Sequence, residues 1–136
     1  MSTPTQLSTD YLIIGAGAMG LAFADTLFHQ NPRAQMIIVD KRAKAGGHWV
    51  DAYPFVSLHQ PAAAYGVNSA KLGSGGQDLS SHAEIMFYFE QVLKKLTASP
   101  RVQFLPLCEC VDFDTNEVQV NSLTDSDTQY LISIRA

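Results

Sequence analysis

The sequence predicts an α/β fold in which three parallel strands form a sheet with flanking helices and a three-stranded antiparallel meander is attached. Three observations predict it. A strand, a helix and a second strand follow one another within residues 10–40, the length of a βαβ unit. A capped amphipathic helix then precedes a third apolar strand, and short strand-like runs close the sequence. With 136 residues, 46% of them hydrophobic, the chain can bury the core of one domain.

The first elements follow from continuous apolar runs. Residues 1–8 are polar and are expected to form a disordered tail, so the folded domain is expected to span residues 9–136. The run YLIIG, residues 11–15, is typical of a strand buried on both faces of a parallel sheet. A helical pattern follows over residues 18–30 and ends at NPR, because proline cannot continue a helix. The run QMIIVD, residues 35–40, predicts the second buried strand.

The middle of the chain combines a long connection with a well-marked helix. Residues 41–80 are rich in glycine and proline and predict a long loop. Ser81 and Glu84 form the capping box S-x-x-E, which predicts the start of a helix over residues 82–96. Apolar residues at helical spacing give this helix one buried face. The run VQFLPL, residues 102–107, predicts a third strand parallel to the first two.

The last part of the chain predicts the meander. The runs CECVDF, EVQV and YLISI are separated by short polar turns. Cys108 and Cys110 lie on the first run, where the C-x-C spacing directs both to one face of a strand. A disulfide across one residue is geometrically poor, so two reduced structural thiols are expected. No metal site is predicted, because His48 and His59 have no third ligand at useful spacing.

Composition and charge exclude several classes of function. The formal net charge is −4, whereas a protein that binds along nucleic-acid phosphates would be basic. The N-terminus lacks the basic start of a secretory signal, and the apolar run of residues 11–24 is shorter than the roughly 18 residues that a membrane helix needs. We therefore expect a cytoplasmic protein that binds neither nucleic acid nor membranes. No motif of hydrolases or of P-loop nucleotidases is present.

Three glycines in the most apolar stretch point to a ligand. Gly15, Gly17 and Gly20 form G-x-G-x-x-G between the first strand and the first helix, which is the context that gives this pattern a mechanism. The first glycine makes the tight turn, the second lets a pyrophosphate approach the backbone, and the third lets the helix pack closely on the strand. The alternative is that the glycines serve helix–strand packing alone.

An acidic residue at the expected position supports dinucleotide binding. Asp40 ends the second strand, 20 residues after Gly20, where a carboxylate can accept hydrogen bonds from an adenosine ribose. An acid at this position also repels a 2′-phosphate and disfavours NADP. Lys41 and Arg42 oppose that argument, because a basic residue nearby can accept the phosphate.

The segment after Asp40 favours FAD over NAD by resemblance. Five residues separate Asp40 from Gly46 and Gly47, and Trp49 follows two places later. Acid, five residues and Gly-Gly after a G-x-G-x-x-G unit resemble the extended FAD signature of the glutathione-reductase-type flavoproteins. With the tryptophan, the pattern is similar to that of flavin-containing and Baeyer–Villiger monooxygenases. The resemblance implies a Rossmann-like FAD/NAD(P)-binding domain.

The resemblance also implies which positions hold the cofactor. Gly15, Gly17, Ala18, Met19 and Gly20 would hold the FAD pyrophosphate. Asp40 would bind the adenosine ribose, with Lys41 beside the adenine. Gly47, His48 and Trp49 would lie along the ribityl chain. Backbone near Cys108 is implied to face the adenine.

The families that the sequence resembles have further motifs that are not found here. They close the FAD domain with a later strand and a glycine-aspartate motif, and the monooxygenases have a second G-x-G-x-x-G. The sequence is therefore expected to be the N-terminal portion of a flavoprotein, incomplete at its C-terminus. A bare edge of the parallel sheet would then permit self-association into a homo-oligomer.

The function predicted from these observations is FAD binding as part of a monooxygenase-like, flavin-dependent oxidoreductase. Two alternatives stay open. One is a fragment of an NAD(P)-dependent dehydrogenase, and the other is a non-catalytic nucleotide-binding or sensor module. In each case the partner is a small-molecule dinucleotide or nucleotide.

Overall fold

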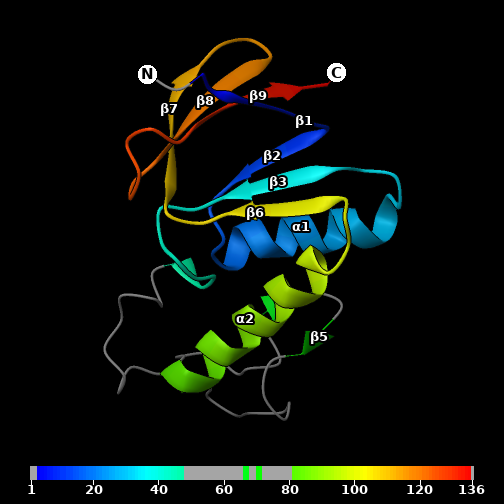
Figure 1. Ribbon diagram of the computed structural model, residues 1–136. Helices are drawn as coiled ribbons and strands as arrows, with labels where there is room; N and C mark the ends of the chain where they lie inside the picture. Colours follow the sequence, from blue (N-terminus) through cyan, green and yellow to red (C-terminus); the bar gives the residue numbers. More distant parts are fainter. Residues whose placement is uncertain (1–2, 48–65, 68–69, 72–80, 136) are drawn as a thin grey trace.

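The computed structural model describes residues 3–47, 66–67, 70–71 and 81–135, and Figure 1 shows their arrangement in three layers. Two helices form the first layer, a parallel sheet the second, and a four-stranded sheet the third. The parallel sheet lies between the helices and the second sheet, so it is covered on both faces.

The parallel sheet has the strand order β2-β3-β6, in parallel register throughout. Its strands are β2 (Tyr11–Ile14), β3 (Met36–Val39) and β6 (Val102–Leu105), which confirms the three predicted strands. All four residues of β3 are buried, because the central strand is covered on both faces. The unbroken apolar run in this part of the sequence is thereby explained.

The two predicted helices are also confirmed, as α1 (Ala18–Gln30) and α2 (His82–Thr97). At the start of α2 the backbone N–H of Glu84 donates to Ser81 Oγ, and the backbone N–H of Ser81 donates to the Glu84 carboxylate, each over 3.2 Å. This is the predicted capping box. The core between helices and sheet contains buried side chains from every element involved: Ile13, Leu21, Ala24, Met36, Ile38, Ile85, Phe89, Val92, Leu96 and Val102.

The predicted meander forms the second sheet together with one strand that was not predicted. Strands β7 (Cys108–Phe113), β8 (Glu117–Ser122) and β9 (Gln129–Ile134) are antiparallel neighbours. A fourth strand, β1 (Thr5–Thr9), pairs in parallel with β9. The sheet order is β1-β9-β8-β7.

Strand β1 corrects the expectation of a disordered tail over residues 1–8. The tail was inferred from its polarity, but threonine suits a strand, and a terminal strand of a sheet needs few apolar residues. Leu7 packs against the core, and Thr9 is almost fully buried. The backbone pairing of β1 is with residues more than 120 positions later in the chain, and no local pattern could indicate that pairing.

A second core lies between the parallel sheet and the meander. Alternate residues of β3 contribute to the two cores, with Met36 and Ile38 on the helix side and Ile37 and Val39 on the meander side. The second core is completed by buried residues of the strands that follow α2: Leu105, Cys108, Val118, Val120 and Ile132. The parallel sheet and the meander therefore pack as one body.

A polar cluster joins the two sheets where the chain passes from β1 to β2. Arg135 Nε donates to Asp10 Oδ1 over 3.0 Å, and the Arg135 guanidinium also bonds the Gln35 side chain. The backbone N–H of Gln35 donates to Asp10 Oδ2 over 2.9 Å. The end of the meander is thus tied to the starts of β2 and β3.

The long connection predicted over residues 41–80 contains one short antiparallel pair, β4 (Gly66–Val67) with β5 (Ala70–Lys71). Residues 48–65, 68–69 and 72–80 of this connection lie outside the described residues.

Candidate functional site

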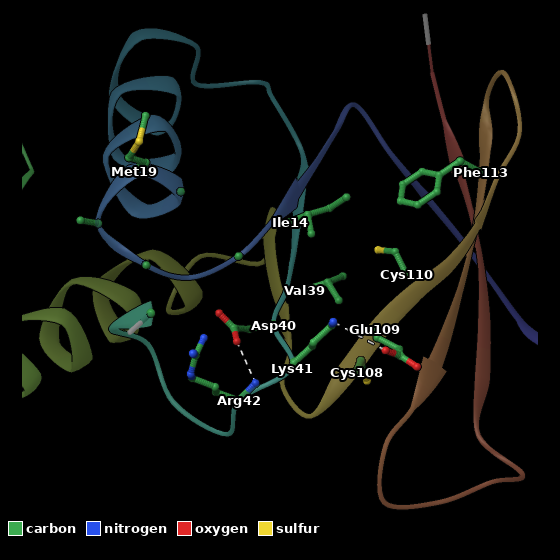
Figure 2. A pocket seen from close by; sticks show the side chains of 15 residues that line it. Ile14, Met19, Val39, Asp40, Lys41, Arg42, Cys108, Glu109, Cys110 and Phe113 are labelled. Atoms are coloured by element: carbon green, nitrogen blue, oxygen red, sulfur yellow. Dashed lines mark hydrogen bonds and ion pairs between the residues drawn. The ribbon is translucent and has the colours of Figure 1, made fainter. Parts of the chain in front are cut away.

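A cavity of about 740 Å³ opens where the carboxyl ends of β2 and β3 meet the N-terminus of α1 and the start of β7. Its volume lies in the range of small-molecule and cofactor pockets, roughly 300–1,000 Å³. The position also agrees with the general rule that α/β sheets bind ligands beyond the carboxyl ends of their strands. Figure 2 shows the side chains that line it.

Most of the positions that the sequence assigned to a cofactor line this one cavity. They come from the glycine turn, from the end of β3 and from the second glycine pair: Gly15, Gly17, Ala18, Met19, Gly20, Asp40, Lys41 and Gly47. His48 and Trp49 lie outside the described residues, as does His59. The fold therefore brings together two glycine motifs that are separated by about 30 residues of sequence.

The glycine turn has a geometry that only glycine fits. Gly15 has a φ of +106°, and its N–H donates to the Val39 carbonyl over 2.7 Å. A Cβ at Gly20 would lie 2.0 Å from the Gly15 carbonyl oxygen. A Cβ at Gly15 would instead meet no atom within 4 Å, because that position faces the open cavity.

The N-terminus of α1 faces the cavity, and among the described residues no side chain caps it. The N-cap residue is Gly17, which provides no side-chain hydrogen bond, and the first turn contains no acidic residue. The first intrahelical hydrogen bond runs from Leu21 N to Gly17 O, over 3.0 Å. The N–H groups of the preceding turn, with the positive end of the helix dipole, are thus suited to an anion.

The two glycine motifs pack backbone against backbone. A Cβ at Gly17 would lie 3.2 Å from Gly47 Cα, and a Cβ at Gly47 would lie 3.0 Å from Gly17 Cα. The N–H of Gly46 donates to the Ala16 carbonyl over 2.8 Å. Gly46 and Gly47 have φ values of +128° and +57°, which favour glycine. This contact explains why a glycine pair follows the acidic residue at a set distance.

Asp40 connects three segments of the cavity wall. Asp40 is buried, with 5% of its surface exposed. Oδ2 accepts from the backbone N–H of Ala16 over 2.6 Å, and Oδ1 accepts from the backbone N–H of Arg42 over 2.8 Å. Its backbone carbonyl accepts from Cys108 N over 3.0 Å, and its N–H donates to Leu105 O over 3.2 Å. The carboxylate therefore holds the glycine turn in place as well as facing the cavity.

Charged side chains of opposite sign lie at the rim. Lys41 Nζ is 3.9 Å from Glu109 Oε2, and the two side chains are 72% and 37% exposed. Figure 2 shows this pair reaching from the end of β3 to β7. Asp40 and Arg42 also line the cavity, so the described part of its wall contains two acidic and two basic residues.

Strand β7 supplies a wall that sequence reasoning mostly missed. The sequence pointed only to backbone near Cys108, whereas Glu109, Cys110 and Phe113 also line the cavity. Figure 2 shows Cys110 and Phe113 on the β7 side and Met19 on the helix side. Ile14 and Phe113 are apolar side chains that line the cavity and are exposed in the fold. Their exposure could indicate a binding surface, but it cannot be read from the sequence.

The two cysteines are free thiols, one buried and one half-buried. Burial raises the pKa of the Cys108 thiol, and burial together with the neighbouring Cys108 raises the pKa of the Cys110 thiol. Reactive cysteines need the thiolate form, so the raised pKa makes these thiols poor nucleophiles. They act as small apolar parts of the wall.

Among the described residues, no three or more histidine, cysteine, aspartate or glutamate side chains are grouped so as to hold a metal ion. Within the same part of the chain, neither helix has both the length and the apolar composition that a membrane span requires.

Comparison with known proteins agrees with the geometry of the site. Residues 13–73, which include the glycine turn, β3 and the second glycine pair, match the family model described as NAD(P)-binding Rossmann-like domain. The matched region has a Rossmann-like fold, in which β2 and β3 pair in parallel and α1 connects them. The predicted Rossmann-like α/β fold is confirmed, with β2, α1 and β3 as its βαβ unit.

Relatives of the Rossmann-like domain include much longer proteins. An uncharacterised protein of Mycobacterium tuberculosis is 45% identical over 78% of this chain and 22% of its own length. A protein of Acinetobacter baylyi described as a probable FAD-binding monooxygenase, AlmA, is 27% identical over 78% of this chain and 21% of its own. The chain thus spans about a fifth of the length of these curated relatives.

Solved structures share the fold of the domain. A flavin-containing monooxygenase from Stenotrophomonas maltophilia superposes with a TM-score of 0.70 at 22% identity, covering 93% of this chain and 36% of the other. The likeness extends over the meander as well as the parallel sheet, because it covers nearly the whole chain.

Proposed function

We propose that the cavity binds the ADP moiety of FAD and that the chain forms the FAD-binding part of a monooxygenase-like flavin-dependent oxidoreductase. One observation carries the proposal: the close backbone contact of Gly17 with Gly47 places both glycine motifs and Asp40 around one cavity. The acid followed by a glycine pair is the feature that separates the FAD signature from the plain dinucleotide pattern.

The residues of the cavity fit such a ligand. The bare backbone at Gly15 leaves open space where a side chain would project. A pyrophosphate in that space can accept hydrogen bonds from the N–H groups of the first turn of α1. The ribose hydroxyls can donate to the remaining lone pairs of the Asp40 carboxylate. When bound, the flavin supplies the redox chemistry, while the protein holds and orients the cofactor.

The proposed oxidoreductase activity rests on the resemblance and on the relatives. AlmA is described as a probable FAD-binding monooxygenase, and the structure from Stenotrophomonas is described as a flavin-containing monooxygenase. The matched region is a minor part of each, so the activity of a whole enzyme requires residues outside the matched region. A cytoplasmic location belongs to the same proposal, in keeping with two free thiols at the cavity.

An NAD(P)-dependent dehydrogenase is the second candidate, favoured by the match to NAD(P)-binding domains. The test is calorimetric titration of the chain with ADP, FAD and NADH, together with thermal unfolding in the presence of each. We expect ADP and FAD to bind with affinities within about tenfold, or 1.4 kcal/mol, because the described cavity serves the ADP moiety.

The other outcomes identify the alternatives. Stabilisation by NADH and not by FAD would indicate the dehydrogenase. Stabilisation by ADP with no effect of either dinucleotide would indicate a nucleotide sensor. A preference of a hundredfold or more for FAD over ADP would show that the chain also forms a pocket for the flavin ring, which contradicts the proposed division of the site.

A further inference from the structure

We propose that Glu109 sets the nucleotide specificity of the cavity, by pairing with Lys41 so that the site accepts adenine nucleotides with a free 2′-hydroxyl and rejects those with a 2′-phosphate. This inference rests on the proposed function, because it takes the Asp40 carboxylate as the ribose site. Asp40, at the end of β3, is otherwise expected to discriminate against a 2′-phosphate alone. The proposal gives part of this discrimination to Glu109 on β7.

The sequence around Asp40 combines an acid that repels a 2′-phosphate with two basic residues that attract it. Lys41 and Arg42 follow the acid directly and line the same cavity. A basic side chain beside the ribose is the usual means of accommodating a 2′-phosphate. Asp40 alone therefore faces two neighbouring cations, and its repulsion of a 2′-phosphate would be offset.

The geometry places Glu109 where it offsets one of those cations. Its carboxylate Oε2 lies 3.9 Å from Lys41 Nζ. Figure 2 marks this ion pair with a dashed line. A 2′-phosphate that used Lys41 would have to displace this carboxylate or lie beside it. In both cases a second negative charge in addition to Asp40 opposes the phosphate.

Backbone hydrogen bonds join the chain just before Glu109 to the segment that contains Lys41. Cys108 N donates to the Asp40 carbonyl over 3.0 Å, and Leu107 N donates to the Arg42 carbonyl over 3.1 Å. The start of β7 is thus joined to residues 40–42, and Glu109 follows immediately. The backbones that carry Lys41 and Glu109 are therefore held next to each other.

The size of the effect is limited by solvent. Both side chains are well exposed, at 72% and 37%, so each charge is screened by water and salt. We expect Glu109→Gln to move the ratio of affinities for ADP and its 2′-phosphate derivative by about threefold to fivefold toward the derivative. The shift should be larger at low ionic strength.

The experiment compares the 136-residue chain with three variants, Glu109→Gln, Glu117→Gln and the double variant Lys41→Gln/Glu109→Gln. Calorimetry measures the affinities for ADP and for adenosine 2′-phosphate 5′-diphosphate at about 0.02 M and about 0.5 M salt. Glu117 is the matched control, since it is an exposed residue of the neighbouring strand β8 and does not line this cavity.

The proposal predicts a distinct result for each variant. Glu109→Gln shifts the ratio at low salt, and the shift shrinks at high salt. Glu117→Gln leaves both affinities unchanged, although it changes the net charge equally. The double variant loses the gain, because Lys41 is the group that Glu109 releases. A gain retained in the double variant would contradict pairing with Lys41.

The failure of the inference is distinguishable from failure of the proposed function. If the unaltered chain does not bind ADP, the proposed nucleotide site is wrong and the inference falls with it. If ADP binds but Glu109→Gln leaves the ratio within twofold, or if Glu117→Gln shifts it equally, only the role of Glu109 is refuted.

Discussion

The glycines of the cavity wall differ in what an added side chain would meet. At Gly20 a Cβ would lie 2.0 Å from a backbone oxygen of Gly15, a contact that requires the turn to move. At Gly17 the nearest atom is Gly47 Cα at 3.2 Å, so the second glycine loop must shift by a few tenths of an ångström. The third glycine of the motif is thus needed for the fold, and the second for the cavity and its contact with Gly47.

Gly17→Val should abolish binding of ADP while the chain still folds, because the side chain fills the space of the pyrophosphate and displaces Gly47. Gly20→Ala should instead destabilise the fold by roughly 3 kcal/mol or more, since it overpacks backbone against backbone. Titration with ADP and thermal unfolding of both variants separate the two effects. Unchanged ADP affinity in Gly17→Val would remove the glycine turn from the phosphate site.

The Asp40 carboxylate combines a structural and a binding role. It accepts hydrogen bonds from two backbone N–H groups, at Ala16 and Arg42, in an almost fully buried position. Replacing it affects the glycine turn even without a ligand. This dual role was not evident from the sequence, which indicated only the ribose contact.

Asp40→Ala should weaken ADP binding by about 1.5–3 kcal/mol, the range for hydrogen bonds to a charged group. It should also lower thermal stability, because a buried N–H group at Ala16 and a part-buried one at Arg42 lose their acceptor. It should further reduce discrimination against a 2′-phosphate. Asp40→Asn keeps an acceptor oxygen and should be less destabilising. Binding of ADP at the original affinity by Asp40→Ala would exclude the carboxylate from the site.

Both ends of α1 have backbone groups without intrahelical partners: N–H groups at the N-terminus and carbonyl groups at the C-terminus. Its N-terminus faces the cavity, and its C-terminus is held by Arg101 from the turn before β6. The guanidinium Nη1 donates to the carbonyls of Asn31 and Ala34 over 2.9 and 3.1 Å, and Nη2 donates to the carbonyl of Phe28. The same group lies 3.8 Å from the centroid of the Phe28 ring.

Arg101→Ala should therefore destabilise the chain by about 2–3 kcal/mol, through lost hydrogen bonds and a lost cation–π contact. Arg101→Lys should be more stable than Arg101→Ala but less stable than the unaltered chain. An ammonium group lacks the planar guanidinium fork that reaches several carbonyls at once. Denaturant unfolding measures the effect, with Arg33→Ala as the control at an exposed arginine in the turn between α1 and β3. Equal stability of the alanine and lysine variants would contradict the role of the fork.

At the scale of the whole molecule, stability depends on the two sheets packing as one body. Buried residues of β3 and β6 meet those of β8 and β9 in the second core. Asp10, Gln35 and Arg135 join the same sheets at the surface. The hydrogen bond from the Gln35 backbone, and then Arg135, hold the pKa of the Asp10 carboxyl below its ordinary value of 3.8.

The sign of the resulting pH dependence follows from that lowered pKa. The ionised Asp10 contributes stability that is fully present above its unfolded pKa, near 4, and is lost as the pH falls through the lower folded pKa. The unfolding free energy of Asp10→Asn should therefore lie below that of the unaltered chain at neutral pH and converge with it in acid. Urea unfolding from pH 7 to pH 2 tests this, with Asp112→Asn, at an exposed residue of β7, as the control. Parallel curves for Asp10→Asn and the unaltered chain would rule it out.

The edge of β2 carries the prediction of self-association. β2 is a terminal strand of the parallel sheet, and the exposed rings of Tyr11 and Phe23 lie beside it with their centroids 6.2 Å apart. A strand edge that pairs with no described strand and is flanked by apolar side chains favours pairing with another chain. Homo-oligomer formation thus stays a prediction, and sedimentation over a range of protein concentrations measures it.

The parallel sheet, both helices and the meander could be predicted from the sequence, because their signals are local. An apolar run ended by Gly15 marks β2, and the sequence NPR marks the end of α1. An apolar run ended by Asp40 marks β3, and the Ser81–Glu84 capping box marks the start of α2. The glycine motif and Asp40 likewise lie within one short βαβ unit. Such patterns act over a few residues and can be read without knowledge of the fold.

Only the tertiary structure decided the pairing of β1 with β9, the contact of Gly17 with Gly47, and the wall that Glu109 and Phe113 add to the cavity. Each of these joins segments that are distant in the sequence. A polar run such as TQLST becomes a strand only when a partner edge is present, and Lys41 meets Glu109 only because β7 starts beside the end of β3. The sequence determined the groups that could bind a nucleotide, and the packing of the two sheets decided which of them share one cavity.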